Sequence, residues 1–316
     1  MRTYAAIYDN EVRRSSSSGG IFSAMASQFE VVYGVAMTDD CYGAEMVRSE
    51  GDISSLRGSK YIQARMGDIF KKVKADLEMG KIVLFSGTGC QVNGLRLFLG
   101  KEYKNLTTVD VICHGVPSHK LWKKYLKNQE IRHGKVKAVD FRCKDKGWVD
   151  FGIKENQKYV SKDQDIYMQM FLRDYSLRPS CYKCVAKKYK TADVTIADFW
   201  GVDIVSPEMY DGKGTSLIIV RNKKGELLFD KIKDDIKYKE VDYNNVLIHN
   251  PSESSSVKKP IERDDFYKDL NDKTFRQLSI KYVEGPLWKR ICRKVKRALI
   301  KFWSGGTTRS VDGIRL

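Results

Sequence analysis

The sequence predicts an α/β fold with mixed α+β character, in which helices flank a partly parallel sheet and a basic helical appendage follows. Short apolar runs alternate with segments of helical periodicity, which is typical of this class. Two of these alternations come in direct succession, at 81–100 and 106–127, and each consists of a buried strand, a loop and a helix. The 42% hydrophobic content of the 316 residues is sufficient for a packed core.

The remaining elements are predicted from local spacing. In 64–79, Ile69, Val73 and Leu77 recur at the period of one helix face. Ser118 stands where the helix of the second strand–helix unit needs its N-cap. The same criteria predict helices over 19–29, 64–79 and 225–234, and strands over 31–37, 136–143, 192–199 and 215–222.

Charge and cysteine content narrow the functional classes. The net charge is +17, from 57 Lys and Arg against 40 Asp and Glu, which favours nucleic acid, an anionic lipid surface or an acidic cofactor as the partner. No regular nucleic-acid-binding motif accompanies this charge, so we expect no nucleic-acid partner. No apolar run is long enough for a membrane span, and the first residues lack the apolar core of a secretory signal, so a cytoplasmic protein is the expectation. Seven cysteines in such a chain indicate metal or redox chemistry rather than disulfides.

Four cysteines occupy positions where a metal site is expected. Cys90 follows the strand of the first strand–helix unit, and Cys113 follows the strand of the second. Residues just beyond the carboxyl ends of such strands share one rim of the sheet. Cys181 and Cys184 form a C-x-x-C pair that could complete a four-thiolate site. Each strand-end cysteine taken alone is more often a core residue, and four thiolates suit zinc as well as iron–sulfur.

Seven motifs in residues 3–245 occur in the order seen in a known family. They are SSSSGGIFS, RGSKYIQA, LFSGTGCQVNGL, VDVICHGVPS, FRCKDKGW, RPSCYKC and ADVTIADFWG. With these motifs the chain resembles the coenzyme F420 hydrogenase/dehydrogenase beta subunit family, whose bacterial relatives are often associated with surface-polysaccharide synthesis. The resemblance implies an oxidoreductase that binds FAD and a [4Fe-4S] cluster, and it leaves the use of coenzyme F420 open. It also implies an N-terminal domain over 1–80 and a C-terminal domain with the iron–sulfur site over 81–250, before a linker and basic amphipathic helix in 251–316.

Carried over motif by motif, the resemblance assigns the cluster to Cys90, Cys113, Cys181 and Cys184, and so favours iron–sulfur over zinc. Gly89 departs from the family motif, which usually has proline before the first cysteine; the turn is looser but the ligand is kept. Many bacterial relatives begin with a ferredoxin-like domain, and this sequence has no counterpart to its cysteine runs. We therefore expect a separate ferredoxin-like protein, a nicotinamide or a deazaflavin as the electron carrier.

The resemblance also implies a flavin site at two glycine-containing turns. A glycine turn that opens a helix offers free backbone N–H groups to a pyrophosphate, and Arg57 with Lys60 adds positive charge. Taken alone, the serine–glycine run 15–20 also fits a flexible linker, and Tyr61 fits either a flavin contact or a core aromatic. The residues matched to the flavin-side motifs are Ser17, Ser18, Gly19, Gly20, Gly58, Ser59, Lys60 and Tyr61.

Two further residues adjoin these motifs, and two other functions compete. His114, next to Cys113, is the candidate catalytic residue as a proton relay to reduced flavin, with a structural histidine as the alternative. Asp198, near the end of the strand at 192–199, is interpreted as a cap or turn residue rather than a catalytic acid. The competing functions are a sugar-modifying transferase with a four-cysteine zinc site and a partner-bound electron-relay subunit without its own substrate.

The stretch 286–303, PLWKRICRKVKRALIKFW, carries seven basic residues and no acid. On a helix its apolar residues fall on one face, with tryptophans near both ends. This pattern predicts an amphipathic helix that holds the protein peripherally on an anionic cytoplasmic membrane. The alternative is a helix packed on the protein's own core with a solvated basic side.

Overall fold

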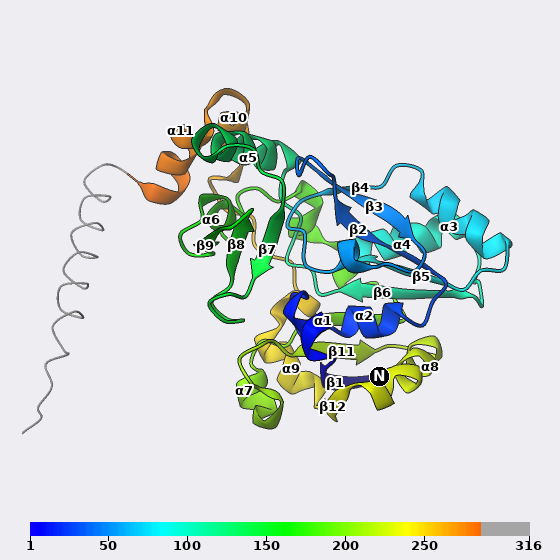
Figure 1. Ribbon diagram of the computed structural model, residues 1–316. Helices are drawn as coiled ribbons and strands as arrows, with labels where there is room; N and C mark the ends of the chain where they lie inside the picture. The colour runs from blue at the N-terminus through cyan, green and yellow to red at the C-terminus, as the bar shows by residue number, and fades with distance from the viewer. Residues whose placement is uncertain (286–316) are drawn as a thin grey trace, which may run out of the picture.

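The computed structural model describes residues 1–285 of the chain, and within them nine strands form one central sheet. The strands are β1 (Arg2–Ile7), β2 (Val31–Met37), β3 (Ala44–Ser49), β4 (Ala64–Arg65), β5 (Val83–Thr88), β6 (Leu106–Val111), β10 (Val194–Asp198), β11 (Ser216–Val220) and β12 (Lys237–Glu240). They lie in the order β12-β1-β11-β10-β6-β5-β2-β3-β4 (Figure 1). The run β10-β6-β5-β2 is parallel, and most of the flanking pairs are antiparallel. The predicted α/β class with a partly parallel sheet is therefore confirmed.

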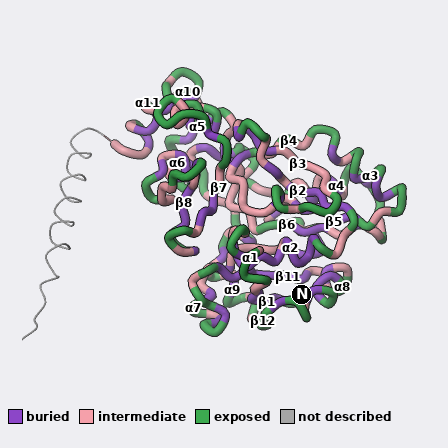
Figure 2. The backbone as a smooth tube through the Cα atoms, in the orientation of Figure 1, coloured by how far each residue is buried: buried purple, intermediate pink, exposed green. Residues whose placement is uncertain are grey.

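Helices cover both faces of this sheet because its central strands are apolar on both sides. In β5, Leu84 packs into the cluster with α2 (Ile21–Ala26) and α8 (Lys223–Ile232). Its neighbours Val83 and Phe85 pack on the opposite face against α3 (Ile69–Glu78) and α4 (Gly89–Leu99). Successive strand residues point to opposite faces, so an uninterrupted apolar run needs cover on both. Accordingly, the residues of β5 and β11 are largely buried, while the outer sides of the helices are exposed (Figure 2).

A second layer surrounds a small antiparallel sheet made of β7 (Val139–Cys143), β8 (Gly152–Glu155) and β9 (Lys158–Ser161). The helices around it are α5 (His119–His133), α6 (Ile166–Leu172), α10 (Arg263–Asp272) and α11 (Phe275–Ser279), at the upper left of Figure 1. Its core is rich in aromatic residues, and Trp122, Tyr125 and Tyr167 are fully or almost fully buried. This layer packs beside the central sheet and encloses part of the cavity described below.

The predicted elements occur, with shifted ends. The strand expected at 31–37 is β2 with the same bounds, and the strand–turn–helix expected at 81–100 is β5 followed directly by α4. The helix expected at 64–79 begins only at Ile69, because Ala64–Arg65 pairs with β3 as a short strand. The helix expected at 19–29 is limited to Ile21–Ala26.

Residues 251–285, expected to be a linker followed by a helix, are more integrated than their polar composition predicts. Glu253 is 1% exposed and forms ion pairs with Arg221 and Lys190. Phe266 in α10 is fully buried in the core of the second layer. The domain boundaries at 80 and 250 remain predictions. The basic helix predicted at 286–303 lies outside the described residues, and none of the helices in 1–285 is long and apolar enough to cross a membrane.

Candidate functional site

A cavity of about 710 Å³ opens where three parallel strands of the central sheet end. Thr88, Val111 and Asp198 are the last residues of β5, β6 and β10, and all three line the cavity. Ligands of open α/β sheets bind at this carboxyl edge. The volume lies in the range of known small-molecule and cofactor sites.

The serine–glycine turn forms one wall of the cavity, and it is not a flexible linker. The Gly19 N–H donates to Ser216 Oγ at 2.9 Å, and the Ser18 hydroxyl donates to the Thr215 carbonyl at 2.7 Å. Gly19 packs so tightly that a Cβ would lie 2.4 Å from the carbonyl oxygen of Ala6. Gly20 has a φ of 86°, a left-handed conformation that favours glycine. The chain direction at this turn is therefore fixed by the sheet behind it.

Two buried cations lie behind the same turn. Arg13, in α1 (Asn10–Arg14), is 2% exposed, donates to the Gly214 carbonyl at 2.7 Å and is paired with Asp211. The Lys144 amine donates to the Arg13 carbonyl at 2.7 Å, and burial lowers the pKa of Lys144 to about 8. The hydrogen bonds of these two cations hold the turn from behind.

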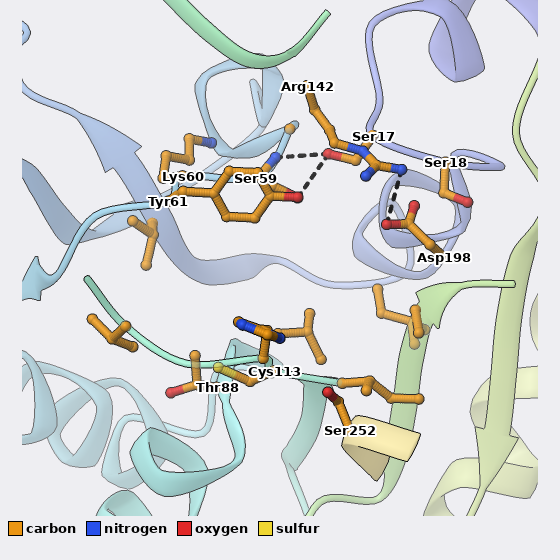
Figure 3. Close-up of a pocket in the computed structure, with 18 of the residues that line it drawn as sticks. Ser17, Ser18, Ser59, Lys60, Tyr61, Thr88, Cys113, Arg142, Asp198 and Ser252 are labelled. Atoms are coloured by element: carbon orange, nitrogen blue, oxygen red, sulfur yellow. Dashed lines mark hydrogen bonds and ion pairs between the residues drawn. The ribbon is translucent and has the colours of Figure 1, made fainter. Parts of the chain in front are cut away.

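The second predicted flavin turn meets the first at the cavity wall (Figure 3). It follows the short helix η1 (Ser54–Leu56), and its Ser59 N–H donates to Ser17 Oγ at 2.7 Å. The two serine hydroxyls are also 2.9 Å apart. Ser17, Ser18, Gly20 and the whole of 57–61 line the cavity, and Gly19 supports them from behind. The structure thus brings together two motifs that are about forty residues apart in the sequence.

Lys60 and Tyr61 occupy the middle of this wall. The Lys60 amine donates to the carbonyls of Ser55 at 2.9 Å and Arg57 at 2.6 Å, and burial lowers its pKa to about 7. The Tyr61 ring lines the cavity and also packs on Phe171, with ring centroids 5.0 Å apart. Tyr61 is therefore a core aromatic that also borders the cavity, and its contact with a flavin stays a prediction.

The four predicted cluster cysteines surround a second, smaller cavity of about 40 Å³. Cys90 is exposed at the start of α4, and Cys113 follows β6. Cys181 lies in η2 (Pro179–Lys183), and Cys184 follows it directly. Cys90 and Cys113 also line the large cavity, so the two cavities share a wall.

The arrangement of the thiols bears on the kind of metal they could hold. Among residues 1–285, no three Cys, His, Asp or Glu side chains form a group that could hold a metal ion as they stand. Tetrahedral zinc needs its sulfurs within about 4 Å of each other, whereas the thiolates of a cubane are about 6–7 Å apart. Four thiols that line one cavity suit either group by ligand type, and the iron–sulfur cluster remains a prediction. Burial raises the pKa of the Cys113 thiol to about 12, so ionisation of Cys113 needs the charge of a metal.

His114 lies between the two cavities and lines both. Its Nε2 is 2.6 Å from Asp174 Oδ1, and its ring packs edge-on against Phe171. Asp174 itself has a φ of 64°, unusual for a residue other than glycine. The contacts are those of a positioned histidine, and the cavity location is what a proton relay needs.

Sequence reasoning assigned no role to Arg142, although its motif FRCKDKGW was among the seven. Arg142 lines the cavity, is 3% exposed and lies 3.0 Å from Asp198, and its guanidinium stacks 3.9 Å from the Phe151 ring centroid (Figure 3). The interpretation of Asp198 as a cap or turn residue is wrong, because Gly201 is the N-cap of α7 (Val202–Val205) and Asp198 pairs with Arg142. The available sequence signal was that Arg142 and Asp198 each stand within one of the seven motifs.

Residues 250–252 also line the large cavity, and no local sequence pattern indicated this. Ser252 borders both cavities, and its carbonyl accepts a hydrogen bond from Lys187, which also donates to the Cys113 carbonyl. The charged residues around the large cavity suit an anionic ligand. Among the lining residues in the described part of the chain, Asp198 is the one acid, and five residues are basic. These basic residues are Arg57, Lys60, Arg142, Lys162 and Arg178.

Comparisons with known proteins identify the family of the chain. Residues 80–245 match the family model for the C terminus of the coenzyme F420 hydrogenase/dehydrogenase beta subunit. The fold is similar to a chain of the F420-reducing [NiFe] hydrogenase complex from Methanosarcina barkeri, with a TM-score of 0.54 and 16% identity over 99% of this chain and 95% of that one. The comparison with curated proteins finds no match. Because the family model covers more than half of the 316 residues, the chain belongs to the coenzyme F420 hydrogenase/dehydrogenase beta subunit family.

Proposed function

We propose that the chain is an iron–sulfur flavoprotein oxidoreductase that passes electrons between a carrier and a substrate. In this proposal FAD occupies the large cavity, and Cys90, Cys113, Cys181 and Cys184 hold a [4Fe-4S] cluster in the small one. Family membership supports the coarser statement, an electron-transfer role like that of hydrogenase and dehydrogenase beta subunits. The observation that carries the finer one is the shared wall, since Cys90 and Cys113 border both cavities.

The chain's own residues would hold an anionic dinucleotide by position and charge. FAD supplies hydride and single-electron chemistry when bound, and the cluster supplies single electrons. The turn at 17–20, fixed by its hydrogen bonds, offers backbone groups for the phosphates, and the basic residues of the cavity balance their charge. The aromatic wall that contains Tyr61 suits the flat ring system.

His114 is the residue proposed to move a proton between the cavity and its surroundings. The Asp174 carboxylate accepts from the Nε2–H of His114 at 2.6 Å and so fixes the plane of the ring. The other ring nitrogen, Nδ1, makes no hydrogen bond within residues 1–285. A histidine oriented by a carboxylate, with one nitrogen unengaged, can exchange a proton with a ligand in the cavity.

The carrier and substrate are proposed more broadly. A ferredoxin-like protein in trans is the proposed carrier, with a nicotinamide or coenzyme F420 as small-molecule alternatives. The proposed setting is surface-polysaccharide synthesis in the cytoplasm, with the segment 286–303 holding the protein on an anionic membrane surface. The absence of a spanning helix in the described part of the chain is compatible with this setting.

The test is the colour and composition of the anaerobically purified full chain. We expect a flavin spectrum with a broad shoulder near the blue that bleaches on reduction, together with FAD, iron and acid-labile sulfide. A colourless protein that contains zinc would contradict the proposal and favour the zinc-containing transferase. Turnover of a small molecule by the isolated chain separates an enzyme from a relay subunit.

A further inference from the structure

The outer surface of the cysteine site is unusually exposed for a redox centre. Cys90, Asn93 and Leu97 are spaced at i, i+3 and i+7 in α4 and so lie along one stripe of the helix. Cys90 is exposed and Leu97 is 84% exposed. A cysteine expected to bind the cluster therefore shares a solvent-facing stripe with a large apolar side chain.

The cysteine loop continues this stripe on its other side. Val185 and Tyr189, around the short helix η3 (Val185–Lys187), are 65% and 66% exposed. Asn93 Nδ2 donates to the Tyr189 carbonyl at 2.9 Å, and Asn93 Oδ1 accepts from Thr191 Oγ1 at 2.6 Å. These bonds join the stripe of α4 to the loop. We call the combined surface of Cys90, Leu97, Lys183, Val185, Lys188 and Tyr189 the thiol face.

The charged residues of the cysteine loop are all basic. The segment 178–190 contains five basic residues and no acid. Lys187 and Lys190 point inward, where they bind the carbonyls of Cys113, Ser252 and Glu253. Lys183 and Lys188 are exposed, and their side chains have no acidic partner among residues 1–285, whereas the exposed Arg178 belongs to the lining of the large cavity. The exposed basic residues are therefore free to meet an acidic partner.

We infer that the thiol face is the docking surface for an acidic protein that carries a one-electron centre. This inference rests on the proposed function, because the electron enters through Cys90 into the cysteine-bound cluster. One electron leaves the reduced centre of the carrier and one is gained by the cluster, so no bond or proton is exchanged; two such transfers match the two electrons that a flavin holds. Exposed apolar residues with unpaired lysines beside them in the sequence favour a folded acidic partner. Opposite charge steers the encounter, and apolar contact stabilises the complex.

The first experiment measures binding and does not depend on the cofactors. The probe is oxidised plant-type [2Fe-2S] ferredoxin, an acidic one-electron protein, titrated against the full chain as purified. Affinity should fall about tenfold as the ionic strength rises from about 0.05 to about 0.3 M, because the facing charges are screened. The double variant Lys183→Glu/Lys188→Glu should bind at least about tenfold more weakly at low salt.

The matched control is Lys231→Glu in α8, an exposed lysine without an ion pair in the described chain, on the opposite face of the sheet from α4. The variant Tyr189→Ser tests the apolar part without changing charge, and it should also weaken binding. Absence of binding, or an equal loss in the control, would overturn the inference. So would a wild-type dimer that the double variant converts to a monomer, since the face would then belong to a second copy.

The second experiment separates this inference from the proposed function. Reduction of the bound flavin by reduced ferredoxin should slow at least about tenfold in the double variant, while reduction by dithionite should be unchanged. If the chain contains no flavin or cluster, the proposed function fails while the binding result still stands. If both cofactors are present and ferredoxin reduces wild type and double variant at the same rate, the docking surface is wrong and the proposed function survives.

Discussion

The serine–glycine turn and the cysteine loop are held in place by different means. At the serine–glycine turn, three successive residues make hydrogen bonds to distant parts of the chain, with a tightly packed glycine among them. At the cysteine loop, the long-range bonds of the cysteines are the Ser256 hydroxyl accepting from the Cys184 N–H at 2.9 Å and the Val116 N–H donating to Cys181 Sγ at 3.4 Å. The conformation of the serine–glycine turn is therefore fixed by hydrogen bonds and packing within the protein.

The difference indicates which of the two proposed cofactors, the flavin or the cluster, would organise its own binding site. Sulfur is a weak hydrogen-bond acceptor, and within residues 1–285 no hydrogen bond joins one of the four cysteine side chains to another. Metal–thiolate bonds would supply that connection and would couple cluster binding to local folding. The flavin wall, in contrast, should keep its shape when the cavity is empty. The following predictions test this contrast, from the largest expected effect to the smallest.

Replacement of Cys184 by serine should remove the cluster and leave the flavin. Cys184 lines the small cavity and not the large one, so its loss breaks the metal site without touching the flavin wall. Iron should fall from about four atoms per chain to less than about one, and proteolysis within 178–190 should become faster. Iron analysis, flavin fluorescence after release and limited proteolysis measure these outcomes. Cys143→Ala, at a buried cysteine of β7 that borders neither cavity, is the control and should keep its iron.

Replacement of Gly19 by alanine should damage the flavin wall and spare the cysteines. The new Cβ would lie 2.4 Å from the Ala6 carbonyl oxygen and 2.7 Å from the Ser216 nitrogen, so the backbone must move. We expect a loss of about 2–4 kcal/mol in the free energy of unfolding, with lower flavin occupancy and unchanged iron.

Gly58→Ala, in the second turn, is the comparison variant. A Cβ at Gly58 meets no atom within 4 Å, so only its left-handed φ of 79° is strained. The expected cost is about 1 kcal/mol. Denaturant unfolding of both variants measures the difference, and equal losses would show that close packing at Gly19 is not what fixes the turn.

Flavin affinity should fall as the pH rises above neutrality. Burial lowers the pKa of Lys60 from 10.5 to about 7, so the free protein loses this proton as the pH passes 7. An anionic ligand favours the charged amine and raises the pKa again, so binding takes up a proton and weakens by up to about tenfold per pH unit above 7. The Kd of FAD between pH 6 and 9 measures this slope. A slope that persists in Lys60→Met would assign the effect to another group.

The same shift predicts the pH dependence of stability in the ligand-free protein. Between pH 7 and 10.5 the unfolded chain binds more protons at Lys60 than the folded chain. The buried charged amine of Lys60 destabilises the folded state. This cost to the free energy of unfolding therefore decreases as the pH rises across this window, and it is at its full size below pH 7. Unfolding of wild type and Lys60→Met at several pH values isolates it, because the difference should change in this window and nowhere below it.

The smallest effect is expected from Ser17→Ala. The Ser17 hydroxyl accepts from the Ser59 N–H at 2.7 Å and joins the two flavin turns. Its removal should cost about 1 kcal/mol, which corresponds to about fivefold weaker flavin binding if the bond is needed to shape the site. Ser15→Ala is the control, since the Ser15 hydroxyl donates only to Val12 within its own helical turn. Equal flavin affinity in the two variants would show that the joint between the turns is dispensable.

The sequence by itself determined the local structure and the positions of the chemistry. Apolar runs and helical spacing act between near neighbours, so β2, β5 and α4 could be predicted with nearly correct ends. Parallel strands place their carboxyl ends together, so Cys90 and Cys113 could be assigned to one rim before any coordinates. The family motifs added the flavin turns and the C-x-x-C pair.

Only the tertiary structure decided which distant residues meet. Ser17 and Ser59 are 42 residues apart, and the Arg142–Asp198 pair and the approach of Ser252 to both cavities span longer intervals. Whether the serine–glycine run is a linker or a wall depended on Ser216, and whether the polar segment after residue 250 is free depended on buried partners of Glu253. Such contacts arise from the closure of the whole chain around a common core, and short-range periodicity carries no record of them.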